Sequence, residues 1–93
     1  YVDASWYLNN PNRNADDDYK MRRIPGAIRF DIDTIRDTSN EHLSSLPHML
    51  PSPSTINKWL HDNKDRLVVY THPGSFAGPR VWWIFTLYGL NTV

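Results

Sequence analysis

The stretch LVVYTHPGSFAGPRVWW, residues 67–83, decides the fold of this chain. It opens on the apolar, β-branched run 67–70, which is typical of a strand buried on both faces of a sheet. Residues 71–75 then form a turn, because their proline fixes φ and their glycine allows a positive φ. A helix is expected next, since Pro79 suits a first helical turn and Gly89 stands where a helix C-terminal glycine would. Strand, loop and helix in this order place loop N–H groups at the carboxyl edge of a parallel sheet, where α/β proteins bind anions.

The rest of the chain alternates strands and helices around that unit. The expected order is a strand at 1–2, a helix over 15–21, a strand over 27–30, a helix opening at 52–53 with an apolar stripe of Ile56, Trp59 and Leu60, the strand at 67–70, the helix after Pro79 and a next strand beginning near 92. A polar loop at 37–45 is expected to bulge into solvent. Alternation of this kind predicts an α/β fold, a parallel sheet with helices on both faces.

Length and composition exclude several classes of protein. Ninety-three residues make one small domain. Ten basic and ten acidic residues cancel, so no broad electrostatic field points to nucleic acid or to an anionic membrane, and no apolar run is long enough to span one. The chain opens on Tyr1 and ends on Val93 as an apolar segment begins, so we interpret it as a piece truncated at both ends. The absence of cysteine excludes disulfides, thiolate metal sites and thiol chemistry within this piece.

Acidic residues follow two of the expected strands. Asp31 and Asp33 come directly after the strand at 27–30, where paired carboxylates can do acid–base work or orient a histidine, or can instead cap a turn at 34–36. Asp3 either accepts hydrogen bonds from loop N–H groups or forms a turn at its strand end.

Two further groups invite a functional interpretation. The three aspartates at 16–18 suggest a metal site, but consecutive residues of a helix point in different directions, so we favour their pairing with the helix macrodipole. His48 stands between two prolines that stiffen its backbone, and an isolated histidine of this kind is more often packed than catalytic.

The central loop offers one basic residue and one weak nucleophile. Arg80 is expected to pair with Asp3 or Asp31 and so lock the loop, in preference to binding substrate directly. Thr71 beside His72 could act as a nucleophile only if the imidazole activated it, and adjacency in the chain is weak support for that contact.

The helix after Pro79 is apolar nearly all round. Its large side chains are Trp82, Trp83, Ile84, Phe85, Leu87 and Tyr88. They cannot all face one sheet, so the pattern predicts a second layer or domain over this helix. A nucleobase platform is disfavoured because such platforms interleave aromatic residues with Lys and Arg.

Several short motifs, in the same order along the chain, resemble one known family. They are Val2-Asp3-Ala4-Ser5-Trp6-Tyr7-Leu8, Ile24-Pro25-Gly26-Ala27, Phe30-Asp31-Ile32-Asp33, Pro47-His48-Met49-Leu50-Pro51-Ser52, Val69-Tyr70, Gly74-x-Phe76 and Pro79-Arg80-Val81-Trp82-Trp83. Together they resemble the first rhodanese domain of the thiosulfate and 3-mercaptopyruvate sulfurtransferases. The resemblance implies a rhodanese-like fold, with residues 1–93 as a single, incomplete domain and the first of two in the parent protein.

The resemblance also implies a function. The parent would move sulfane sulfur from thiosulfate or 3-mercaptopyruvate, through a cysteine persulfide in its second domain, to cyanide, a thiol or a sulfur-carrier protein. Asp33 and His48 would border the cleft between the domains and assist a serine and the cysteine there, while Asp31 and Arg80 would line the cleft or organise the loop. The partners would be the second domain and a small anionic sulfur donor, without metal, organic cofactor, nucleic acid or membrane, in mitochondria or cytoplasm.

The central loop departs from the family pattern. Thr71 stands where the first domain usually carries aspartate, and the loop is longer than the compact cysteine-to-arginine loop of active rhodanese domains. This piece alone is therefore expected to be inactive. The alternative is a catalytically inactive rhodanese-like module that binds or regulates other proteins, and a cysteine-bearing second domain would separate the two hypotheses. A phosphatase-like relative would also need the missing cysteine.

Overall fold

The computed structural model describes residues 1–8, 11–39, 46–60, 66–90 and 92. Its elements are β1 (Val2–Asp3), α1 (Ala15–Met21), β2 (Ile28–Arg29), α3 (Pro53–Leu60), β3 (Val69–Tyr70) and α4 (Gly78–Leu87). The expected order of strands and helices is confirmed. Part of the predicted polar loop at 37–45, residues 40–45, lies outside the described residues.

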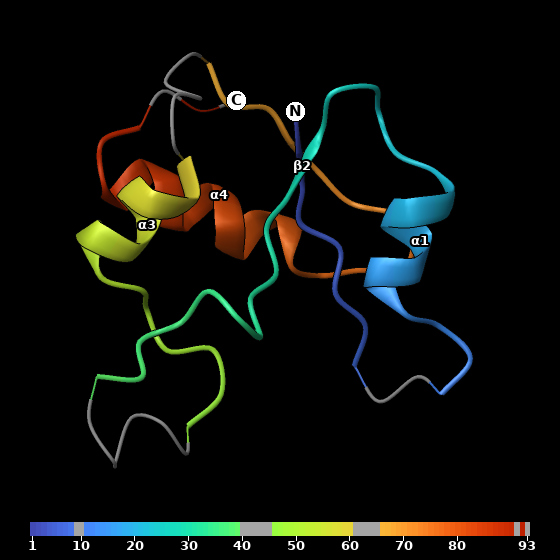
Figure 1. Ribbon diagram of the computed structural model, residues 1–93, viewed down its shortest axis with the longest axis horizontal. Coiled ribbons are helices and arrows are strands. Elements are labelled where there is room, and N and C mark those ends of the chain that lie inside the picture. Colours follow the sequence, from blue (N-terminus) through green and yellow to red (C-terminus); the bar gives the residue numbers. More distant parts are fainter. Residues whose placement is uncertain (9–10, 40–45, 61–65, 91, 93) are drawn as a thin grey trace.

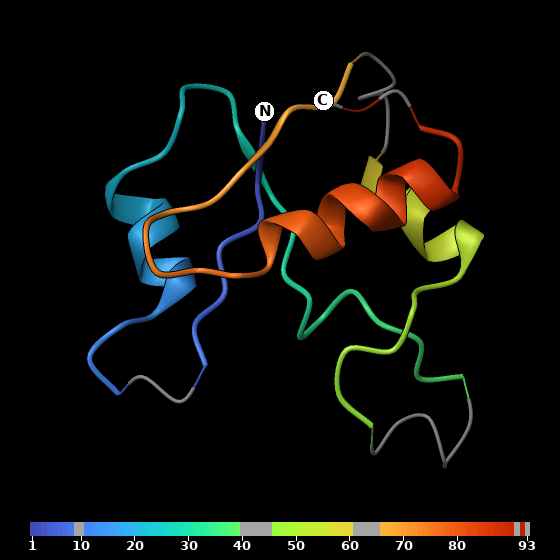
Figure 2. The same ribbon diagram turned by 180° about the vertical axis from the view of Figure 1, so that it is seen from behind.

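The three strands form one parallel sheet in the order β2-β1-β3. Val2 pairs with Ile28 on one side and Val69 on the other. Figure 1 shows α1 on one side of the strands and α3 and α4 on the other, and Figure 2 shows the same arrangement from behind. The prediction of an α/β fold with a parallel sheet and helices on both faces is confirmed. Leu67 also pairs with Thr92 in an isolated parallel bridge, next to β3.

The hydrophobic core lies between the sheet and the pair α3 and α4. Its fully buried large side chains include Phe30, Ile56, Ile84 and Phe85. The ring of Phe30 makes T-shaped contacts with Trp59 and Phe85, at centroid distances of 4.9 Å and 5.3 Å. These aromatic contacts join one strand end to both helices, and so fix how the helices sit on the sheet.

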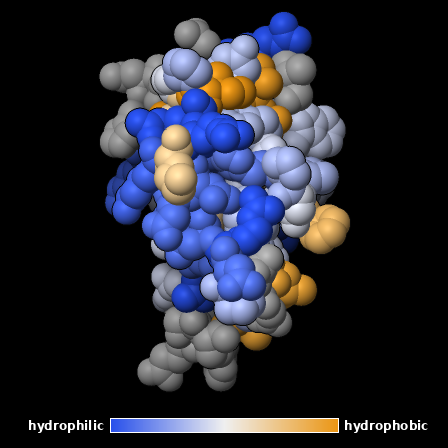
Figure 3. Space-filling view, turned by 90° about the vertical axis from the view of Figure 1, so that its right-hand side faces the viewer, coloured by the Kyte–Doolittle hydropathy of each residue, from blue (hydrophilic) through white to orange (hydrophobic). Residues whose placement is uncertain are grey.

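The opposite face of the sheet is more polar than the sequence predicted. The run at 67–70 was expected to be buried on both faces, yet Val69 and Tyr70 are only half-buried. The reason is that α1 is a seven-residue helix without a buried side chain. Figure 3, which looks onto the α1 side, shows a mostly hydrophilic surface.

Local turn and cap chemistry follows the sequence closely. Asn14 caps α1, because its Oδ1 accepts hydrogen bonds from two backbone N–H groups of the first turn. Ser52 does the same for α3 through Thr55 N. Gly74 and Gly89 have φ values of +92° and +74°, the left-handed conformation predicted for the loop and for the end of α4.

One side of α4 is open to solvent in this chain. Val81, Ile84 and Phe85 face the core, whereas Trp82 and Trp83 remain 43% and 49% exposed. The second layer predicted over this helix is not among the described residues. Within those residues, no helix combines the length and the apolar character that a membrane span requires.

Candidate functional site

Asp33 and His48 meet beyond the carboxyl end of β2. His48 Nε2 lies 2.7 Å from Asp33 Oδ1, although the two residues are fifteen positions apart. The His48 side chain is 23% exposed and that of Asp33 is 58% exposed. The pair therefore sits at the surface with one ring edge held, an arrangement that lets an imidazole exchange protons with a neighbouring molecule.

Trp6 holds the other oxygen of the same carboxylate. Its indole Nε1 donates a hydrogen bond to Asp33 Oδ2 at 3.0 Å. The Trp6 ring also meets the His48 ring edge to face, with centroids 4.9 Å apart and planes at 89°. A carboxylate, an imidazole and an indole thus contact one another pairwise.

The backbone of His48 is held in an unusual conformation. Its φ of +58° is the only positive value at a residue other than glycine among the described residues. Such conformations persist where neighbouring contacts hold them, and they cluster at functional sites. Arg80 supplies one such contact, because its Nη2 donates to the His48 carbonyl oxygen.

The prediction that Arg80 pairs with Asp3 or Asp31 is therefore wrong. The guanidinium reaches the irregular segment around His48 instead, and its Nε is buried with no hydrogen-bond partner among the described residues. Arg80 still ties the start of α4 to a distant loop, so it organises a different loop from the expected one.

The sequence left two roles open for Asp31 and Asp33, capping a turn and orienting a histidine, and each residue takes one of them. Residues 31–34 form a turn, and Asp31 Oδ1 accepts a hydrogen bond from Asp33 N at 2.8 Å. The Asp31 carboxylate thus caps the turn, which leaves the Asp33 carboxylate free to reach His48. Arg36 Nε donates to Asp33 O at 2.9 Å and fixes the turn from its other end.

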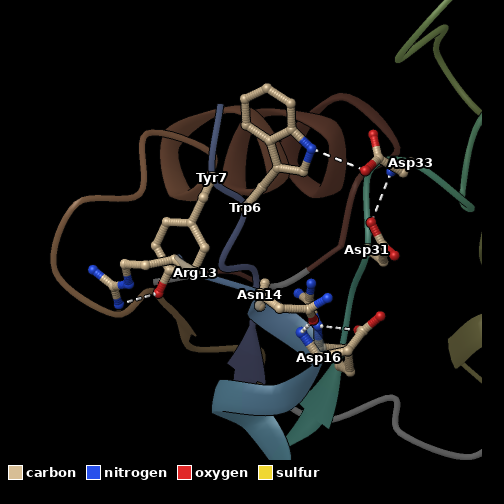
Figure 4. Close-up of a pocket in the computed structure, with 9 residues that line it drawn as sticks. Trp6, Tyr7, Arg13, Asn14, Asp16, Asp31 and Asp33 are labelled. Carbon is tan, nitrogen blue, oxygen red and sulfur yellow. Dashed lines mark hydrogen bonds and ion pairs between the residues drawn. The ribbon is translucent and has the colours of Figure 1, made fainter. Parts of the chain in front are cut away.

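A shallow polar cleft adjoins this pair. Figure 4 shows its lining, which brings together the N-terminus of α1, the segment after β1 and the turn after β2. The cleft has a volume of about 170 Å³ and is lined by Trp6, Tyr7, Arg13, Asn14, Ala15, Asp16, Arg29, Asp31 and Asp33. Two guanidinium groups and three carboxylates face it, so it suits a small polar molecule better than an apolar one.

The three aspartates of α1 diverge, as the helix geometry predicted. Asp16 pairs with Arg29 at 3.2 Å, and Asp18 pairs with Arg13 at 3.1 Å. Within the described residues, no group of three or more histidine, aspartate or glutamate side chains is arranged to hold a metal ion.

A second histidine, His72, belongs to the central loop. His72 Nε2 is 3.5 Å from Asp3 Oδ2, and the Asp3 side chain is fully buried. Asp3 Oδ1 accepts from Ser5 N at 3.0 Å, and Ser5 Oγ accepts from His72 N at 2.8 Å. Asp3 thus binds the backbone of its own segment and contacts the loop through His72. The His72 imidazole lies against Asp3, and among the described residues no hydrogen bond joins it to Thr71, which it would have to activate. The bond from Ser5 N supports the turn at the strand end as the role of Asp3. The position of the His72 imidazole gives no support to Thr71 as a nucleophile.

Arg13 joins the segment after β1 to the central loop. It lies 4.1 Å from the centroid of the Tyr7 ring, and its Nη1 donates to Pro73 O at 2.8 Å. Tyr7 in turn donates to Asp18 Oδ2 at 2.8 Å. Burial and the bond to Asp18 raise the pKa of Tyr7 to about 12, and the bonds from Tyr7 and Arg13 lower the pKa of Asp18.

Sequence reasoning missed Trp6 and Arg13 as site residues. Trp6 follows β1 at the same sheet edge as Asp33, so the rule that parallel strand ends meet at one edge could have found it. Arg13 lies in an irregular polar segment, where no spacing rule predicts its partners.

Known sulfurtransferases match this chain along most of its length. It is 41% identical to thiosulfate/3-mercaptopyruvate sulfurtransferase 1, mitochondrial, of Arabidopsis thaliana, over 99% of the chain and 24% of that protein. It is 38% identical to 3-mercaptopyruvate sulfurtransferase of Escherichia coli K12, over 88% of the chain and 29% of that protein. Thiosulfate sulfurtransferase of Rattus norvegicus is also 38% identical, over 99% of the chain and 31% of that protein.

No family model matches the chain. The chain spans less than a third of the length of each of these three relatives. Identity of this level over nearly the whole chain, with a parallel α/β fold, agrees with the resemblance carried by its motifs. The chain is therefore a homologue of one region of the thiosulfate and 3-mercaptopyruvate sulfurtransferases.

Proposed function

We propose that this chain is the first, non-catalytic rhodanese domain of a two-domain sulfurtransferase. The relatives are named for thiosulfate, for 3-mercaptopyruvate or for both, and each is much longer than this chain. The chain has no cysteine, so the nucleophile has to come from another part of the protein. A second rhodanese domain would supply it.

The reaction transfers one sulfur atom in two steps. A cysteine thiolate takes the outer sulfur of thiosulfate and releases sulfite, or takes the sulfur of 3-mercaptopyruvate and releases pyruvate. The persulfide then gives that sulfur to cyanide, a thiol or a sulfur-carrier protein, and the thiolate returns. No metal or organic cofactor enters either step.

The Asp33–His48 pair carries this proposal. Its 2.7 Å contact joins an exposed carboxylate to a partly exposed imidazole, which can face a second domain. In this role the carboxylate orients the imidazole, which exchanges protons with the serine and the cysteine of the cleft. Asp31 supports the pair by capping the turn, and Arg80 by holding the His48 carbonyl.

Thiocyanate formation from cyanide tests the proposal, with thiosulfate and then 3-mercaptopyruvate as donors. We expect turnover by the full-length protein and none by the 93-residue chain, and the preferred donor would identify the enzyme. Turnover by the 93-residue chain alone would refute the argument from the missing cysteine.

The variant His48→Ala should lower sulfur transfer by the full-length protein without changing its circular dichroism or thermal unfolding. Lys20→Ala in α1 is a matched surface control, because it also removes a side-chain nitrogen but lies away from the pair. Wild-type turnover by His48→Ala would remove the pair from the mechanism.

An inactive binding module is the second candidate. The observation that favours it is the exposed apolar surface of α4, formed by Trp82, Trp83 and Leu87, which a partner protein could cover. Absence of turnover by the full-length protein with either donor would support this function instead.

The compartment is also a proposal. One relative carries the word mitochondrial in its name, and we propose mitochondria or cytoplasm for this protein.

A further inference from the structure

We infer that Trp6 is a positioning residue, which holds the Asp33 carboxylate so that His48 keeps its proton on Nε2 and presents Nδ1 as the proton acceptor. The inference rests on the proposed function, because it gives this tautomer a purpose in sulfur transfer. The hold of Trp6 on Asp33 and His48 rests on contacts within this chain alone.

The two oxygens of the Asp33 carboxylate each contact one ring nitrogen. Oδ1 lies 2.7 Å from His48 Nε2, and Oδ2 lies 3.0 Å from Trp6 Nε1. Indole Nε1 is a donor only, so the direction of its bond is certain. With Oδ2 bound in this way, rotation of the carboxylate is restricted and Oδ1 stays directed at the imidazole.

The tautomer follows from the same geometry. An aspartate carboxylate accepts hydrogen bonds, so the nitrogen that faces it at 2.7 Å carries the proton. In a neutral imidazole the other nitrogen, Nδ1, is then the acceptor. This is the logic of hydrolase triads, in which a carboxylate selects the histidine tautomer, although here the roles of the two nitrogens are exchanged.

The Asp33–His48 contact alone would be a weak restraint. The Asp33 side chain is 58% exposed, so water competes for both of its oxygens. Trp6 opposes this competition in two ways, because its N–H occupies Oδ2 and its ring packs against the imidazole at 4.9 Å. The same residue therefore restrains both partners.

Trp6 is itself well anchored. Its backbone N donates to Ser75 Oγ at 2.9 Å, which ties it to the central loop. The residue before it, Ser5, is fully buried. The turn at Asp33 is held by bonds to the Asp33 backbone and leaves its carboxylate free to rotate. Trp6, whose own backbone is anchored, can therefore restrain that carboxylate.

The test uses the full-length protein labelled with ¹⁵N-histidine and the variant Trp6→Phe, which keeps an aromatic ring but loses the N–H. Trp59→Phe is the matched control, because Trp59 Nε1 donates to Arg29 O at 2.8 Å, in the core and away from His48. His48→Ala assigns the His48 resonances by their disappearance.

In the wild type we expect His48 Nε2 to resonate as a protonated nitrogen and Nδ1 as an unprotonated one. In Trp6→Phe the two shifts should converge, as they do when tautomers interchange. We also expect kcat to fall about tenfold with KM little changed, which is less than the roughly 10²–10⁴-fold of general acid–base catalysis itself, because Trp6 acts only through Asp33. Trp59→Phe should leave the shifts of His48 and kcat unchanged.

Wild-type His48 shifts in Trp6→Phe would overturn the inference. Converging shifts with wild-type kcat in both Trp6→Phe and His48→Ala would support the hold of Trp6 on the tautomer and refute the proposed role of the pair. The two failures are thus distinguishable.

Discussion

Truncation of two aromatic residues on α4 should separate its covered side from its open side. Phe85 is fully buried and stacks on Trp59 at a centroid distance of 5.4 Å, so Phe85→Ala loses contacts and leaves a cavity. Changes of this kind cost about 3–5 kcal/mol of unfolding free energy. A domain of this size has a total of roughly 5–15 kcal/mol, so the loss is a large share of its stability.

Trp83, two positions earlier, should behave differently. Its side chain is about half exposed, so its truncation uncovers on the order of 100 Å² of buried area, worth at most about 2.5 kcal/mol, and leaves no closed cavity. Had this helix been covered on both sides, as its sequence suggests, Trp83→Ala would also cost about 3–5 kcal/mol.

Urea unfolding of the 93-residue chain, followed by circular dichroism, measures both losses. The slope of free energy against urea should stay the same in the two variants, because both unfold the same domain. A loss in Trp83→Ala as large as that in Phe85→Ala would refute the assignment of the open side. In the full-length protein a second domain on this side would raise the cost of Trp83→Ala and leave that of Phe85→Ala unchanged.

Two smaller changes test the contacts around the central loop. Gly74→Ala should destabilise the chain by about 1–3 kcal/mol in urea unfolding, because φ is +92° and a Cβ there would lie 3.2 Å from Arg13 Nη1; stability equal to the wild type would refute it. Asp18→Asn should lower the pKa of Tyr7 from about 12 toward its usual value of 10.0 in an ultraviolet titration, because the neutral amide no longer disfavours the phenolate. The pKa of Asp18 is lowered from 3.8 in the folded chain, so its contribution to stability is full above that value and is lost as the pH falls through the folded pKa. Asp18→Asn should therefore unfold with a weaker dependence on acid, and an unchanged acid limb would contradict this reasoning.

Local chemistry made most of the secondary structure predictable. The helix over 15–21 was predicted with the bounds that it has, because its cap and its acidic first turn are neighbours in the sequence. The conformations of Gly74 and Gly89 were predictable for the same reason, since a single residue type decides them.

Contacts between irregular segments were not predictable in this way. Arg80 reaches the His48 carbonyl, across thirty-two positions, instead of an aspartate at the sheet edge. A guanidinium satisfies its donors with any nearby oxygen, and the conformation of residues 46–51 decides which oxygen is near. The contact between Asp33 and His48 was expected from the family resemblance, whereas their spacing alone favoured a turn cap and a packed histidine.

The sequence analysis overestimated the burial of β3. The apolar content of a strand does not indicate how large the helix that covers it will be. Four apolar residues in a row are consistent with cover on both faces. Here the covering helix on one face has seven residues and an acidic first turn, so the sheet meets a polar cluster there. Tyr70 illustrates the result, because its hydroxyl accepts a hydrogen bond from Ile24 N at 3.1 Å while burial raises its pKa.

Three N–H groups of the central loop are already bonded within the chain. Loop N–H groups at the carboxyl edge of a parallel sheet are the groups that would bind an anion. Here three amides of the loop donate within the chain, from His72 to Ser5 Oγ, from Ser75 to His72 O and from Ala77 to Ser75 Oγ. An anion in this loop would have to displace those bonds, and it would lie beside the buried Asp3, whose carboxylate would repel it. The loop therefore acts as a support: its Ser75 anchors Trp6, and Trp6 in turn holds the Asp33 carboxylate that contacts His48.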